Sequence, residues 1–186
     1  MAKKKKIFRG QREVRTFADL SHGAKVMIMK SEEEEKGSYY TIMSALLLTA
    51  FTFEAYLNHL GAKRIPFWSD IDSIRVMDKY SVLAKDLSLA PDFSRRPYQT
   101  LRALYRFRNA LAHGKSEIVK AEKEVREDID PYEHFPKAEW EEFCTLANAK
   151  RCKEDVDAIV SELHLSAGLG KYPYMHSIGT GSVSSK

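Results

Sequence analysis

Residues 42–60 read IMSALLLTAFTFEAYLNHL and form the most apolar run of the chain. Large apolar side chains occur around most of the circumference of a helix drawn through this run, which is typical of a helix enclosed by other elements. They are Ile42, Leu46, Leu47, Leu48, Phe51, Phe53, Tyr56, Leu57 and Leu60. Because the run also contains Glu54, Asn58 and His59, we interpret it as a buried core helix rather than a membrane span. Ser38 can cap this helix, and Gly61 followed by Pro66 is expected to end it.

Helical periodicity continues on both sides of this central run. Apolar spacing predicts helices over residues 12–30, 73–87 and 97–114, and a long last helix that opens at Pro136 and closes at Gly168. No segment alternates between apolar and polar residues with the period of a strand. The predicted fold is therefore all-α, a single helical bundle of about five helices.

The chain of 186 residues fits one domain with tails. We expect a basic flexible arm over residues 1–11, the helical domain over residues 12–168, and a disordered Gly/Ser-rich tail over residues 169–186. The polar, charged residues 115–135 predict a mostly exposed loop. Cys144 and Cys152 lie about 12 Å apart along the last predicted helix, too far for a disulfide. With no apolar leader after the N-terminal lysines, we expect reduced thiols and a cytoplasmic location.

Positive charge is concentrated in one part of the sequence. Residues 93–116 contain six basic side chains and no acid, so the remaining residues carry −2 of the formal net charge of +4. The six are Arg95, Arg96, Arg102, Arg106, Arg108 and Lys115. A second basic run, residues 3–6, could add non-specific attraction to polyanions or serve only as a solubilising end.

The predicted helix over residues 97–114 carries polar groups where apolar ones are expected. On a helical wheel Arg108 falls near the centre of the apolar sector, although a guanidinium stays charged and is costly to bury alone. It needs an anion, a cleft between subunits, or water at its tip. Asn109 and His113 share one flank of the helix, together with Arg102 and Arg106.

This flank combines groups that can act on a phosphate. His113 occupies the last helical turn, where the negative end of the helix favours the imidazolium, and histidine can serve as general acid or base. Arg108 and Asn109 can hold a phosphate while it reacts. Together these groups suit metal-independent RNA cleavage, in which the 2′-hydroxyl attacks the neighbouring phosphate. Arg108 and His113 lie about 140° apart around the helix, so a symmetric dimer would help to pool their groups.

Simpler interpretations exist for the same residues. A histidine before a helix-ending glycine is often only a cap, and Arg108 could be paired with a carboxylate such as Glu54. Glu54 itself could support Arg108 or His113, or form a salt bridge with Lys79. Arg102 and Arg106 could form a solvated basic face or contact RNA backbone.

The stretch RNALAH, residues 108–113, resembles the R-N-x-x-x-H signature of HEPN-domain proteins. Its surroundings are similar as well. ALLLTAFTFEAYLNHLG resembles the first core helix of that family, and MDKYSVLAKDL followed by DFSRRPYQTLRALYRFRNALAHG resembles the run-up to the signature. The likeness covers about residues 38–114. The flanking segments match only as further helices of a bundle.

The resemblance implies a HEPN-like all-α bundle, and many such proteins are metal-independent endoribonucleases of toxin–antitoxin, phage-defence and RNA-processing systems. It implies that Arg108 holds the phosphate, that His113 is the catalytic histidine and that Asn109 supports them in a cleft shared by a homodimer. The product would be a 2′,3′-cyclic phosphate, formed without metal or cofactor. The resemblance also allows for an antitoxin or another partner protein, and no membrane partner is expected.

The functional interpretation extends to further residues. Glu54 would support the cleft, while Arg102, Arg106 and Lys115 would contact the RNA backbone. Lys115 stands where some HEPN toxins carry a tyrosine modified by a partner nucleotidyltransferase, so that control is not expected here. The alternative is a non-catalytic HEPN module that binds RNA, a nucleotide or a partner protein.

Overall fold

The computed structural model describes residues 6–34, 36–124, 134–175 and 179–185, and these residues are mostly helical. In chain order the elements are β1 (Lys6–Gln11), α1 (Thr16–Glu33), α2 (Ser38–Arg64), α3 (Trp68–Ile71), α4 (Val76–Asp86), α5 (Tyr98–His113), α6 (Glu139–Phe143), α7 (Leu146–Ser166) and β2 (Thr180–Ser185). The predicted helical character is confirmed, although two strands are present that the sequence did not predict.

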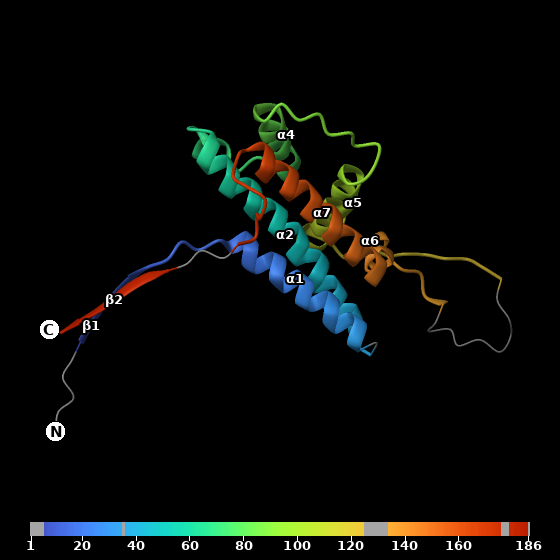
Figure 1. Ribbon diagram of the computed structural model, residues 1–186. Helices are drawn as coiled ribbons and strands as arrows, with labels where there is room; N and C mark the ends of the chain where they lie inside the picture. The colour runs from blue at the N-terminus through green and yellow to red at the C-terminus, as the bar shows by residue number, and fades with distance from the viewer. Residues whose placement is uncertain (1–5, 35, 125–133, 176–178, 186) are drawn as a thin grey trace, which may run out of the picture.

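Helix α2 forms the centre of the helical body, with α1 and α7 lying along it and α4 and α5 packed on another side (Figure 1). The apolar side chains on its inner side, including Leu46, Phe53 and Leu57, are fully buried against these helices, whereas Leu47 and Leu48 are half-buried and Phe51 is exposed. By length and composition alone α2 could cross a membrane. In the structure the buried half of its apolar stretch meets other helices, as predicted for a core helix.

The end of α2 differs from the prediction, because Gly61 lies inside the helix rather than ending it. A Cβ atom at Gly61 would come within 2.2 Å of the Trp68 ring. The glycine therefore allows the short helix α3, which the sequence did not predict, to place Trp68 directly on α2. The helix ends at Arg64, just before Pro66.

The predicted last helix is in fact two helices, α6 and α7, with a break after Phe143. Thr145 caps the new helix, since its side chain accepts a hydrogen bond from the Asn148 amide at 3.2 Å, and the Asn148 side chain donates to the Phe143 carbonyl at 2.8 Å. Cys144 lies in this break, and both cysteines are free and buried. Burial raises the pKa of Cys144 to about 11 and that of Cys152 to about 12, so both thiols stay protonated near neutral pH.

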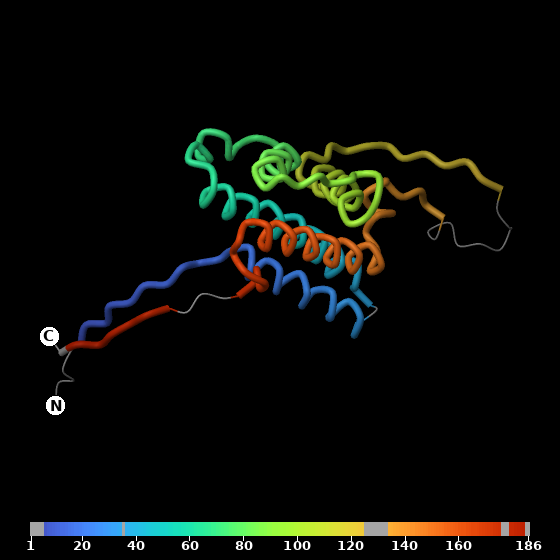
Figure 2. The backbone as a smooth tube through the Cα atoms, turned by 45° about the horizontal axis from the view of Figure 1, so that its top comes forward, coloured from blue at the N-terminus to red at the C-terminus, as the bar shows by residue number. Residues whose placement is uncertain are grey.

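Strands β1 and β2 form an antiparallel ribbon that projects from the helical body (Figures 1 and 2). This finding corrects the predicted flexible arm over residues 1–11 and the disordered tail over residues 169–186 within their described parts. The chain between α7 and the ribbon also docks on the body. The Tyr174 hydroxyl donates to Asp157 Oδ1 at 2.7 Å, and the Met175 carbonyl accepts from Arg15 at 3.1 Å. Residues 1–5 and 176–178 lie outside the described residues.

Candidate functional site

An open groove of about 630 Å³ lies between α2, the start of α4 and the C-terminal half of α5. It contains four of the residues that the sequence predicted as a site, namely Glu54, Arg108, Asn109 and His113. Its other lining residues are Ser73, Ile74, Arg75, Val76, Met77, Asp78 and Tyr105. Although five positions separate Arg108 from His113 on α5, both border the same groove.

Arg108 lies at the inner wall of the groove with 24% of its side chain exposed. Its Nη2 atom is 3.5 Å from Glu54 Oε2, and its Nη1 atom donates to Asn109 Oδ1 at 3.1 Å. The guanidinium also lies 5.8 Å from the centre of the Phe51 ring, a favourable cation–π distance. Within the described residues its buried Nε has no hydrogen-bond partner. The distance between Arg108 and Glu54 is longer than the two short hydrogen bonds of a bidentate arginine–carboxylate pair. Arg108 therefore keeps hydrogen-bonding capacity for an anion.

Glu54 lies between two cations, so both pairings considered for it, with Arg108 and with Lys79, are present. Its Oε1 atom is 3.6 Å from Lys79 Nζ, while its Oε2 atom contacts Arg108. The Lys79 side chain is only 3% exposed, and its ammonium also donates to Asn58 Oδ1 at 3.0 Å. One carboxylate therefore serves two cations, and this cluster keeps one net positive charge.

The other ion pair that lines the groove has no net charge. Arg75 Nε donates to Asp78 Oδ2 at 2.7 Å at the start of α4. Since this pair cancels, the surplus charge beside Arg108 determines the sign of the local potential. A groove with a surplus cation favours an anionic group.

Tyr105 holds α5 against α2 beneath the groove. Its hydroxyl donates to the Ala50 carbonyl at 2.8 Å, and the side chain is buried. Burial raises the pKa of Tyr105 well above its ordinary value. Tyr105 therefore stays protonated and tied to the backbone, and it is a positioning residue rather than a proton carrier.

His113 is the last residue of α5 and is exposed to solvent at the end of the groove. Among the described residues no hydrogen bond or ion pair orients its ring. The chain leaves the helix at Gly114, which lies very close to the preceding turn. A Cβ atom at this position would lie 2.5 Å from the Ala110 carbonyl oxygen, so a larger residue would not fit. The glycine thus permits the tight helix end that leaves the imidazole open.

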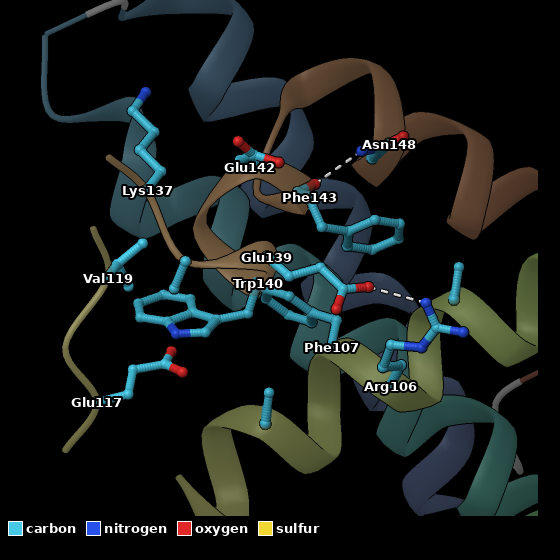
Figure 3. A pocket seen from close by; sticks show the side chains of 13 residues that line it. Arg106, Phe107, Glu117, Val119, Lys137, Glu139, Trp140, Glu142, Phe143 and Asn148 are labelled. Atoms are coloured by element: carbon cyan, nitrogen blue, oxygen red, sulfur yellow. Dashed lines mark hydrogen bonds and ion pairs between the residues drawn. The ribbon is translucent and has the colours of Figure 1, made fainter. Parts of the chain in front are cut away.

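The structure places the other predicted RNA-contacting residues away from the groove. Arg106 pairs with Glu139 at 2.8 Å and borders a second cavity of about 580 Å³ between α5 and α6, beside Trp140 (Figure 3). The Arg102 guanidinium lies 5.2 Å from the centre of the Phe93 ring. Lys115 is exposed beyond the end of α5 and does not line the groove. The predicted flank is therefore divided: Asn109 and His113 border the groove, Arg106 borders the second cavity, and Arg102 borders neither.

Sequence reasoning missed Arg75 and Asp78, which line the groove, and Phe51, whose ring contacts Arg108. The i, i+3 spacing of Arg75 and Asp78 was a usable signal for a local ion pair, whereas the cation–π contact of Phe51 depends on how α2 and α5 pack. Across the described part of the chain, no three side chains of His, Cys, Asp and Glu gather closely enough to hold a metal ion. Comparison of this chain with protein-family models, curated proteins and solved structures finds no match.

Proposed function

We propose that this protein is a metal-independent endoribonuclease of the HEPN type, working as a homodimer in a defence or toxin-like role. The observation that carries the proposal is the meeting of Glu54, Arg108, Asn109 and His113 on one open groove. The groove combines a surplus positive charge, which suits a phosphate, with an exposed imidazole, which can move protons. The R-N-x-x-x-H resemblance assigns the same roles to Arg108 and His113.

The proposed reaction needs only protein groups and the RNA itself. Arg108 and Asn109 hold a phosphodiester, and His113 accepts the proton of the adjacent 2′-hydroxyl. The 2′-oxygen then forms a bond to phosphorus while the bond from phosphorus to the 5′-oxygen breaks. The leaving oxygen takes a proton from a second, protonated imidazole. The products are a 2′,3′-cyclic phosphate and a free 5′-hydroxyl, with atoms and charge balanced.

The need for a second imidazole is the reason for proposing a dimer. The groove contains one histidine. Its other acidic groups already have partners, since the Tyr105 hydroxyl is hydrogen-bonded to the backbone, Glu54 is paired with Lys79 and Arg108, and Asp78 is paired with Arg75. A two-fold axis near the C-terminal end of α5 would bring His113 of the partner subunit to the same phosphate. A protein that is monomeric at the concentrations at which it cleaves RNA would contradict this arrangement.

The test incubates the full chain with single-stranded RNA in excess chelator and compares His113→Ala with the unchanged protein. Loss of a general acid–base residue should slow cleavage by about 10²–10⁴-fold. His22→Ala, which removes an exposed histidine from α1, is the matched control and should cleave normally. DNA of the same sequence should stay intact, because it lacks the 2′-hydroxyl. Equal cleavage by the two histidine variants would reject the proposal.

A second function is favoured by one observation, the absence of a partner that orients His113 among the described residues. Catalytic histidines are usually held by a third group. A non-catalytic HEPN module would use Arg108 and the net positive cluster to bind RNA, a nucleotide or a partner protein. Tight RNA binding without products, equally strong in His113→Ala and lost in Arg108→Ala, would establish this function instead.

A further inference from the structure

The β1–β2 ribbon has no role in the groove and stands apart from the helical body (Figure 2). Every residue of β1 is exposed, and so are residues 180–184 on β2. The two strands pair with each other, from Lys6 with Ser185 to Gln11 with Thr180. A two-stranded ribbon buries little surface and is marginally stable by itself. Such an exposed projection is suited to binding something that lies outside the body.

The charges of the ribbon have a single sign. Residues 1–12 contain six basic side chains and no acid, and residues 176–186 contain no acid either. Lys6, Arg9 and Arg12 make no ion pair with any residue that the structure describes. These cations are therefore available to an external polyanion, whose attraction would depend strongly on salt.

One face of the ribbon presents a supported aromatic ring. Phe8 is 71% exposed and shares its face with Gly10 and with Gly181 on the partner strand. A Cβ atom on Gly10 would lie 2.7 Å from the Phe8 ring, and one on Gly181 would lie 2.8 Å from it. The ring therefore lies across the glycine pair, which gives it a defined position while its other side stays open. Exposed rings in basic surroundings are platforms on which nucleobases stack.

The opposite face of the ribbon carries hydrogen-bonding groups. Arg9 and Gln11 alternate there and are paired with Ser182 and Thr180 on β2. Guanidinium, amide and hydroxyl groups are the side chains that contact phosphate and sugar in nucleic-acid complexes. One face can thus follow the backbone while the other receives a base.

From this combination we infer that the ribbon is an arm that binds single-stranded RNA. The choice of RNA over DNA rests on the proposed function, whereas the charge and the aromatic platform do not. An anionic lipid surface fits less well, because Ile7 lies on the face opposite Phe8 and Val183, so no face of the ribbon presents more than two large apolar side chains to a bilayer. A second copy of the ribbon also fits less well, since pairing would bring like charges together.

The test measures RNA binding by the full chain carrying His113→Ala, so that no cleavage is expected. The arm variant adds Lys6→Ser, Arg9→Ser and Arg12→Ser. The matched control adds Lys25→Ser, Lys30→Ser and Lys85→Ser, which removes the same charge from exposed positions on the body. The probe is a short, unstructured, fluorescent RNA, titrated between about 50 and about 200 mM salt.

The arm variant should bind about tenfold more weakly than the control at low salt, and its salt slope should be smaller by about 2, as expected for three lost phosphate contacts. Phe8→Ala should weaken binding by about tenfold without changing the slope. Equal binding by the arm and control variants would overturn the inference. The inference would also be overturned if the arm variant lost binding to anionic vesicles but kept its RNA binding. The same holds if its only change were a different oligomeric state. Cleavage that survives in His113→Ala would instead count against the proposed function alone.

Discussion

Residues 93–116, which include α5, and the β1–β2 ribbon are the two basic regions of this protein. In sequence both lack acids, but in the structure four of the five arginines of the first region pair with acids outside it, while Arg102 lies over the Phe93 ring. The pairs are Arg95 with Asp92 at 2.9 Å, Arg96 with Asp155 at 2.8 Å, Arg106 with Glu139 at 2.8 Å and Arg108 with Glu54 at 3.5 Å. Within the described residues no carboxylate reaches Lys6 or Arg9 of the ribbon.

The difference follows from where each region lies. Arg108 is drawn into the contact of α5 with α2 and needs a carboxylate to offset its desolvation. Arg95 and Arg106 stay exposed, but acids of the helical body lie within reach of them. The ribbon lies in water, where an unpaired cation costs little. A basic run in a sequence therefore indicates a polyanion surface only after its tertiary surroundings are known. In this protein Arg108 keeps part of its capacity to bind an anion, whereas the cations of the ribbon keep their full capacity.

The largest loss of stability is expected from removing the charge of Glu54, the carboxylate on α2 that Lys79 and Arg108 share. Glu54→Gln leaves Lys79 buried and Arg108 half-buried without a counter-charge, which should lower the free energy of unfolding by about 2 kcal/mol. Glu139→Gln is the control, because its pair with Arg106 is 75% and 70% exposed and should contribute about 0.5 kcal/mol or less. Urea denaturation at neutral pH measures both. Equal losses in the two variants would show that burial does not distinguish these pairs.

A smaller loss of stability is expected at acidic pH, and it arises where the ribbon joins the helical body. His164 lies under this attachment with its Nδ1 atom 3.0 Å from the Tyr56 hydroxyl, and His59 lies nearby against Phe17. Burial lowers the pKa of both histidines below the ordinary value of 6.5, with Lys63 and Arg15 acting in the same direction. As the pH falls, these two histidines therefore take up protons at a higher pH in the unfolded chain than in the folded protein.

Stability should accordingly be fully present above pH 6.5 and should decline as the pH falls through the lowered pKa values. Thermal melts at a series of pH values measure this decline, which should be smaller than the effect of Glu54→Gln. His164→Gln should flatten the profile, whereas His22→Gln on the exposed face of α1 should leave it unchanged. A profile that rises toward acid would contradict the sign of these shifts.

The smallest global effect is expected in the ribbon itself. Gly181→Val places a branched side chain against the Phe8 ring and should open the ribbon, as shown by faster proteolysis there. The free energy of unfolding should change by less than about 0.5 kcal/mol, because the helical body is untouched. Ser182→Val, on the opposite face, should leave the ribbon closed. A loss as large as that of Glu54→Gln would mean that ribbon and body unfold as one unit.

Local patterns predicted much of the helical body. The expected helix of residues 97–114 corresponds to α5, and the apolar run of residues 42–60 lies within α2, because periodicity and helix-ending residues act over a few positions. The break after Phe143 was missed, since Thr145 and Asn148 resemble ordinary helical residues until their hydrogen bonds are seen. The strands were missed because each is short and its partner lies far away in the sequence.

The candidate site was predicted unevenly for a related reason. Glu54, Arg108, Asn109 and His113 were found because one helix carries three of them and a charge on the apolar central helix is conspicuous. Arg106 was assigned to the same flank, but its long side chain turns toward Glu139 on α6. The direction of a flexible cation depends on the nearest acid, and that acid comes from another part of the chain.

The amino-acid sequence alone determined the helical class, the central position of α2 and the order of polar groups along α5, since these depend on interactions between residues a few positions apart. Only the tertiary structure decided which cations are neutralised, which stay open to an anion, and that residues 6–11 and 180–185 pair as a ribbon. Those outcomes depend on desolvation and on contacts between distant segments, which no local pattern records.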